Sequence, residues 1–263
     1  MPISGSPSNS TGWCWVEGGP VPLRCWWSPA SPCPEDGPRW NEGVTPTARP
    51  RAVIVLPEVF GVNGWVRSVA DRIAAAGVPA LAMPLFARTA PELELGYGPE
   101  QLVEGRRHKD AASTDQILAD LNAAIAWLQN TLQGNLDITV VGFCFGGHAA
   151  LLAASLPQVS QAFDFYGAGV AQGRPGGGAP SLELLPQVQG QLTCLCGSAD
   201  PLIPAEDRAA IASAFLAADP SGKRLRYWEF EGADHGFMCE ARDSFNPAAA
   251  EQGWRLLLEA LRA

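Results

Sequence analysis

One cysteine of this chain lies in a setting typical of a catalytic nucleophile. The apolar residues 138–141 run into Gly142-Phe143-Cys144-Phe145-Gly146, which is the strand–turn–helix pattern G-x-S-x-G with cysteine in place of serine. A helix that starts directly after the turn points its first amides at the sulfur, which favours a thiolate and later an oxyanion. The other interpretation is a buried cysteine in a glycine-rich turn. The spacing fits neither a dinucleotide-binding fingerprint nor a phosphate loop with its lysine, so we predict that Cys144 is a nucleophile.

A nucleophile of this kind needs a base, and the chain has only three histidines. His108 lies in a charged run and is predicted to be a solvated surface residue. His148 lies on the helix after Cys144 and is predicted to be structural. His235 follows the predicted strand 224–230, and the carboxyl end of a strand is where α/β sheets carry their chemistry. A nucleophile that precedes the histidine is also the order of α/β-hydrolases, so His235 is the predicted base.

The acid that orients this base should lie between the two, again after a strand. Asp200 meets both conditions, because it follows the predicted strand 192–196 and a glycine turn. A carboxylate there would fix the tautomer of His235. Asp234 is an alternative, but a side chain adjacent to the histidine would have difficulty reaching the far ring nitrogen. Asp164, in an apolar strand, remains a weaker alternative.

A fourth ionisable residue, Glu58, stands alone at the end of the apolar strand 52–56. Glutamate is rarely buried without a partner, so one interpretation is that it points outward from a loop. The other is that it lies within hydrogen-bond reach of Cys144 and holds or accepts the thiol proton.

The elements that must position these residues alternate along the chain. The clearest helix spans residues 113–132, with apolar residues on one face and a capping box formed by Ser113 and Gln116. Alternation of strands and helices predicts one α/β domain with a mainly parallel central sheet and helices on both faces. The predicted strands are 52–56, 78–83, 138–141, 161–166, 192–196 and 224–230, and the predicted helices are 65–76, 113–132, 146–155, 205–218 and 248–261.

The first 50 residues differ from the rest, being rich in Pro, Ser, Gly and Trp. Residues 12–17 and 21–27 flank Gly18-Gly19-Pro20 and are predicted to form a β-hairpin, followed by a loop over 29–50. The tryptophans at positions 13, 15, 26 and 27 are expected to cover one end of a sheet. We therefore divide the chain into an extension, 1–50, packed on a core domain, 51–263.

Composition excludes several classes of function. The 263 residues are 47% hydrophobic and carry a net charge of −9, and an acidic surface repels nucleic acid. No segment is apolar enough to span a membrane and none reads as a secretory signal, so a cytoplasmic location is expected, with reduced cysteines. Cys194 and Cys196 are predicted to be buried in a strand. No ligand cluster for zinc is apparent, and no cofactor is expected.

The chain resembles the dienelactone hydrolase (carboxymethylenebutenolidase) family from about Arg51 to its C-terminus. The resemblance implies an α/β-hydrolase fold and hydrolysis of an enol lactone to a keto acid. It also implies that Glu58 pairs with the resting thiol, that the backbone N–H groups of Phe145 and Val59 bind the oxyanion, and that Arg88 binds a substrate carboxylate. The matching stretches are Glu58-Val-Phe-Gly-Val-Asn63, Phe86-Ala-Arg88, Gly142-Phe-Cys-Phe-Gly-Gly147, Asp200 before Pro201, His235-Gly-Phe237 and Phe245-Asn246-Pro247-Ala-Ala-Ala250.

Two departures bear on the substrate. The family usually has Pro-Asp where this chain has Met83-Pro84, and a second carboxylate-binding arginine of the family is Cys239 here. Arg242 could replace that arginine, but spacing does not establish it. The leading hypothesis is a monomeric hydrolase of a small, anionic lactone or activated ester, for which a thiolate is well suited. A general carboxylesterase or thioesterase is the alternative, and a non-catalytic ligand-binding relative is a third.

Overall fold

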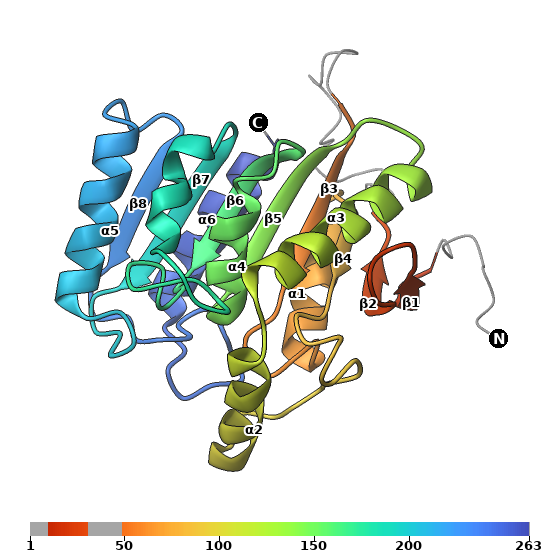
Figure 1. The fold of residues 1–263 in the computed structure, drawn as a ribbon, viewed down its shortest axis with the longest axis horizontal. Helices are drawn as coiled ribbons and strands as arrows, with labels where there is room; N and C mark the ends of the chain where they lie inside the picture. The colour runs from red at the N-terminus through yellow and green to blue at the C-terminus, as the bar shows by residue number, and fades with distance from the viewer. Residues whose placement is uncertain (1–9, 31–48, 263) are drawn as a thin grey trace.

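The computed structural model describes residues 10–30 and 49–262 and shows one eight-stranded sheet with helices on both faces (Figure 1). The strand order is β1-β2-β4-β3-β5-β6-β7-β8, and the strands from β4 to β8 are all parallel. This confirms the predicted fold class. The strands are β1 (Gly12–Val16), β2 (Leu23–Ser28), β3 (Arg51–Leu56), β4 (Ala80–Ala82), β5 (Asp137–Phe143), β6 (Val159–Phe165), β7 (Gln191–Gly197) and β8 (Leu225–Phe230).

The helices form two layers, with α1 and α6 behind the sheet in Figure 1 and α3, α4 and α5 in front of it. Residues Ala52 to Leu56 of β3 are fully buried, as expected of a parallel strand covered on both faces. The carboxyl ends of parallel strands meet at one edge of the sheet, and this brings together segments that are far apart in sequence. The helices are α1 (Gly64–Ala75), α2 (Pro99–Asp110), α3 (Thr114–Thr131), α4 (Phe145–Ala153), α5 (Ala205–Ala218) and α6 (Pro247–Arg262), with a short 3₁₀ helix, η1 (Ser181–Gln187).

The predicted N-terminal hairpin is present, but it extends the sheet instead of covering its end. β1 pairs with β2, and β2 pairs with β4, both antiparallel. Trp27 is buried and packs edge-on against Trp127 of α3, whereas Trp13 and Trp15 are 37% and 44% exposed. Residues 12–28 thus share a sheet with the chain after residue 50. The predicted loop 29–50 lies mostly outside the described residues.

The capping box at the start of α3 is also confirmed. The Ser113 hydroxyl accepts from the Gln116 amide at 3.4 Å, and the Gln116 side chain accepts from the Ser113 amide at 3.2 Å. Two elements were not predicted, α2 and η1, and β4 is shorter than the predicted strand 78–83. α2 begins with Pro99 in its first turn, a position where proline costs no hydrogen bond.

Candidate active site

Cys144 lies at a sharp turn between β5 and α4. Its backbone has φ 55° and ψ −119°, a left-handed conformation that is costly for a non-glycine residue and is concentrated at functional sites. Its amide donates to the carbonyl of Phe165 at 3.0 Å, which ties the turn to β6. A side chain at Gly142 would overlap the carbonyl oxygen of Gly146, so these glycines permit the close approach of strand and helix. The predicted elbow is therefore present, with the sulfur at its tip.

His235 and Asp200 form a hydrogen-bonded pair next to this turn. The distance from His235 Nδ1 to Asp200 Oδ2 is 2.8 Å, and the carboxylate is held from its other side by the Leu202 amide at 2.8 Å. Burial opposes the charged ring, but the Cys144 sulfur and the Asp200 carboxylate outweigh burial and raise the pKa of His235 to about 10. His235 is therefore an imidazolium near neutral pH.

The two alternative carboxylates lie elsewhere. Asp234 accepts a hydrogen bond from the backbone amide of His235 at 2.5 Å, so it does not meet the ring nitrogens. Asp164 accepts from the Gly167 amide at 2.8 Å and lies 3.6 Å from the sulfur of Cys194. Of the three carboxylates considered, the structure brings only Asp200 to the imidazole.

Tyr166 was missed by the sequence analysis. It follows β6 at the same edge of the sheet, with a positive φ of 44°, and its ring packs edge-on against the His235 ring with centroids 5.1 Å apart. Burial raises the pKa of its hydroxyl well above the ordinary value. Its place directly after a strand was the signal that could have identified it.

Glu58 is buried, with 1% of its surface exposed, so the interpretation that it points outward is wrong. Its Oε1 accepts a hydrogen bond from Arg242 at 2.7 Å, whereas its Oε2 has no hydrogen-bond partner among the described residues. Burial raises the pKa of Glu58, and the charges of Arg242 and His235 lower it in part. The hydrogen-bond partner of Glu58 is thus Arg242, and the expected hydrogen bond to the Cys144 thiol is not present among the described residues.

Substituting Arg242 by glutamine is expected to destabilise the protein strongly. Glu58 would then be left as a buried carboxylate without its counter-ion, which costs about 3 kcal/mol of unfolding free energy. Urea unfolding at pH 7 measures the loss. The double variant Glu58→Gln/Arg242→Gln serves as the control, because it removes both charges and should recover most of the stability. Equal stability of the single and double variants would contradict the importance of this pair.

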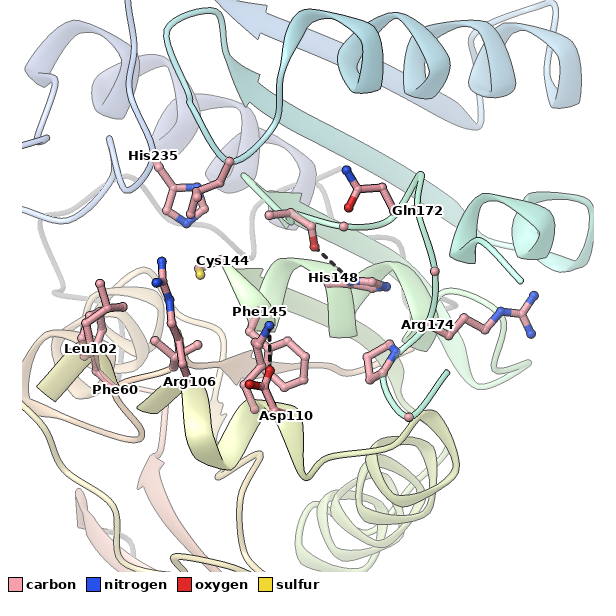
Figure 2. A pocket seen from close by; sticks show the side chains of 18 of the residues that line it. Phe60, Leu102, Arg106, Asp110, Cys144, Phe145, His148, Gln172, Arg174 and His235 are labelled. Carbon is pink, nitrogen blue, oxygen red and sulfur yellow. Dashed lines mark hydrogen bonds and ion pairs between the residues drawn. The ribbon is translucent and has the colours of Figure 1, made fainter. Parts of the chain in front are cut away.

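A cavity of about 780 Å³ opens in front of Cys144 (Figure 2). Phe145 and Val59, the predicted oxyanion donors, both line it, and Phe145 is the first residue of α4, where helix amides lack partners within the helix. α2 supplies the facing wall, and the loop after β6 supplies the far end. The remaining lining includes Phe60, Leu102, Arg106, Lys109, Asp110, His148, Gln172, Arg174, Leu202, His235 and Arg242.

Arg88 does not line this cavity, which contradicts the role in binding a substrate carboxylate that the resemblance implied for it. Its guanidinium makes two hydrogen bonds, of 2.5 and 2.9 Å, to the carboxylate of Asp120 on α3. Asp120 is only 2% exposed, and a buried carboxylate requires such a counter-ion. The pair of hydrogen bonds with which Arg88 could hold a substrate carboxylate is already made within the protein.

Of the predictions for the other two histidines, one is wrong and one agrees with the structure. His108 is only 5% exposed, so the prediction of a surface residue is wrong; its ring nitrogens lie 3.0 Å from Thr89 Oγ1 and 2.9 Å from a Glu104 oxygen. His148 has a structural role as predicted, contacting the Ala168 carbonyl at 3.0 Å and Ser181 Oγ at 2.7 Å. Burial lowers the pKa of His148 to about 4, so its ring is neutral.

Two kinds of feature are absent from residues 10–30 and 49–262. No group of three or more His, Cys, Asp or Glu side chains there is arranged to hold a metal ion. No helix of this part of the chain is both long and apolar enough to cross a membrane. The predicted burial of Cys194 and Cys196 is confirmed, since neither is exposed.

Comparison with known proteins gives a consistent result. Residues 43–263 match the model of the dienelactone hydrolase family. A relative from Synechocystis sp., whose name places it among the carboxymethylenebutenolidases, is 40% identical over 204 residues, which are 77% of this chain and 82% of the relative. The carboxymethylenebutenolidase of Pseudomonas putida is 29% identical over 208 residues, 78% of this chain and 83% of that protein.

A solved structure has the same fold. A crystal structure from Klebsiella pneumoniae, named as a dienelactone hydrolase, superposes with a TM-score of 0.75 at 23% identity and covers 95% of this chain and 96% of its own. At that identity the likeness concerns the fold alone. The family match extends over most of the chain and includes the turn that carries Cys144 and the segments of Asp200 and His235. The chain therefore belongs to the dienelactone hydrolase family and is a hydrolase of ester bonds.

Proposed function

We propose that Cys144 is the nucleophile of this hydrolase, with His235 as its acid and base and Asp200 as the residue that orients His235. One observation carries the proposal: the 2.8 Å contact between Asp200 and His235 lies at the cavity that Cys144 enters from its turn. Because Asp200 occupies Nδ1, the other nitrogen of His235, Nε2, is left for proton exchange with the sulfur and the substrate.

The reaction then proceeds in two stages. The Cys144 thiolate attacks the carbonyl carbon, and the amides of Phe145 and Val59 stabilise the oxyanion. The carbon–oxygen bond of the ester breaks, and the His235 imidazolium gives its proton to the leaving oxygen. A water molecule, deprotonated by His235, then attacks the thioester and releases the acid and the free Cys144.

We propose a lactone as the substrate, because the Pseudomonas putida relative is named for hydrolysis of a butenolide. In a lactone the leaving oxygen stays attached to the acyl group, so a single product is released. Glu58 is proposed to hold Arg242 in place beside the nucleophile through their 2.7 Å contact.

The six described cysteines carry free thiols, which supports a cytoplasmic location.

The test of this proposal is the covalent intermediate. The purified protein is mixed with p-nitrophenyl acetate, quenched in acid and digested, and the peptides are analysed by mass spectrometry. We expect an acetyl group on Cys144, together with turnover of dienelactone and release of p-nitrophenol. Full turnover by protein whose Cys144 has been completely alkylated would refute the proposal.

A general carboxylesterase or thioesterase is the second candidate. The cavity of about 780 Å³ is of the size that accommodates drug-sized ligands, which is more than a small lactone requires. A substrate panel separates the two candidates, since an esterase of this kind would favour long acyl or thioester substrates over dienelactone.

A further inference from the structure

Asp164 is a carboxylate in the interior of the sheet that the proposed reaction does not use. It lies on β6, the strand between β5 and β7 (Figure 1), and none of its surface is exposed. Its neighbours in the strand are Phe163 and Phe165. Burying a carboxylate is costly unless its oxygens are bound, so the contacts of this side chain should show why it is placed here.

The two oxygens of Asp164 face different partners. Oδ1 accepts a hydrogen bond from the Gly167 amide at 2.8 Å, and Oδ2 lies 3.6 Å from the sulfur of Cys194 on β7. Oδ1 also lies against the first turn of α4, because a side chain at Gly147 would come within 2.5 Å of it. Burial raises the pKa of Asp164 to about 7, and both the acid and the carboxylate keep an oxygen that can accept from Gly167.

The hydrogen bond from Gly167 closes a short turn over residues 164–167, at the end of β6. Tyr166, inside this turn, has a positive φ of 44°, which is costly for a residue with a bulky side chain. Aspartate side chains commonly stabilise turns by binding a backbone group a few residues later. Because the Asp164 side chain reaches from the start of the turn to the residue after Tyr166, it holds Tyr166 in this conformation.

The same turn contacts the nucleophile and the base. The Phe165 carbonyl accepts from the Cys144 amide at 3.0 Å, and the Tyr166 ring packs edge-on against the His235 ring with centroids 5.1 Å apart. Asp200 holds Nδ1 of His235 at 2.8 Å, but an imidazole held by one hydrogen bond can still tilt about that bond. The Tyr166 ring limits the tilt.

We infer that Asp164 is a positioning residue, which through the turn 164–167 fixes the Tyr166 ring against His235 and so aims the His235 ring at Cys144. A small displacement of a reacting group can cost a large factor in rate. A carboxylate buried two residues before Tyr166 can therefore influence catalysis without touching the substrate. The inference rests on the proposed function, since it adds a positioning residue to that same site.

The kinetic experiment compares Asp164→Val with Asp164→Asn. Valine suits a strand and avoids the cost of burying a carboxylate, so the variant should fold, which circular dichroism verifies. Asp164→Ala, with a side chain smaller than aspartate, is measured in parallel, so that a misfit of valine beside Gly147 does not decide the result. We expect kcat for p-nitrophenyl acetate to fall about tenfold to a hundredfold in the valine and alanine variants.

Two further variants distinguish the hydrogen bond from the charge and from packing. Asp164→Asn should keep kcat within about threefold of the wild type, because its amide oxygen can accept the same bond from Gly167. Cys194→Ala is the matched control, because it removes the contact of Oδ2 and leaves the bond from Gly167 untouched. Its kcat should equal that of the wild type.

A spectroscopic measurement reports on His235 itself. The chain has three histidines, so NMR spectra of protein with ¹³C-labelled histidine contain few ring signals, and His235→Asn identifies the signal of His235. The neighbouring Tyr166 ring shifts this signal through its ring current. We expect that shift to shrink in Asp164→Val and to persist in Asp164→Asn and Cys194→Ala.

Two results would overturn the inference. One is an unchanged His235 signal in Asp164→Val and Asp164→Ala, and the other is an equal loss of kcat in Asp164→Asn, which would indicate that the charge matters and not the hydrogen bond. If the wild type hydrolyses no ester but the His235 signal moves in Asp164→Val, the proposed function fails and the positioning role holds. If esters are hydrolysed and neither signal nor kcat changes in Asp164→Val, the positioning role fails alone.

Discussion

Replacing Cys144 by alanine is expected to lower kcat/KM for dienelactone and p-nitrophenyl acetate by about a thousandfold or more. Loss of a nucleophile removes the covalent route altogether and leaves only the binding and oxyanion contributions. Steady-state kinetics at pH 7.5 measure the effect, and circular dichroism verifies the fold. Cys14→Ser is the control, because Cys14 lies on β1, outside the cavity lining, and should retain full activity. Activity of Cys144→Ala within tenfold of the wild type would exclude a covalent mechanism at this residue.

Asp200→Asn is expected to lower kcat by roughly a thousandfold to ten-thousandfold. The asparagine amide would face Nδ1 of His235 and favour the wrong tautomer, as in other triads. The pH profile gives a second readout. Because Asp200 helps raise the pKa of His235 to about 10, the alkaline limb of kcat/KM should lie near that value in the wild type. It should move to lower pH in the variant, since the charge that stabilises the imidazolium is gone.

Asp234→Asn is the matched control for this prediction. Asp234 is the residue before His235 but binds only a backbone amide there, and an asparagine oxygen can accept the same bond. Its kcat and its alkaline limb should therefore stay close to those of the wild type. If Asp234→Asn fell as far as Asp200→Asn, the assignment of the orienting carboxylate would be wrong.

The sequence predicted the structure best where local motifs and the pattern of buried residues pointed to the same element. The capping box of Ser113 and Gln116 and the apolar face behind it predicted α3 almost to the residue. The glycines around Cys144 predicted the elbow because the close approach of strand and helix excludes any side chain at Gly142. The loops carrying Asp200 and His235 follow their strands directly, so strand order alone predicted that they would meet.

The sequence was least informative where position depends on a distant partner. α2 contains few apolar residues, and its buried face depends on Gly105 and His108, which composition does not identify as core residues. Arg88 resembled a free cleft arginine because its partner, Asp120, lies 32 residues later. A carboxylate beside Leu121 on the apolar face of α3 was the available signal that a cation must approach from elsewhere.

The surroundings of Cys144 are drawn from both ends of the polypeptide. The contact between Glu58 and Arg242 spans 184 residues, and His235 follows the cysteine by about a third of the chain's length. During synthesis Cys144 therefore leaves the ribosome before His235 and Arg242 have been added to the chain. The hydrogen-bonded pair of Asp200 and His235 beside Cys144 can therefore form only after residue 235 has been added.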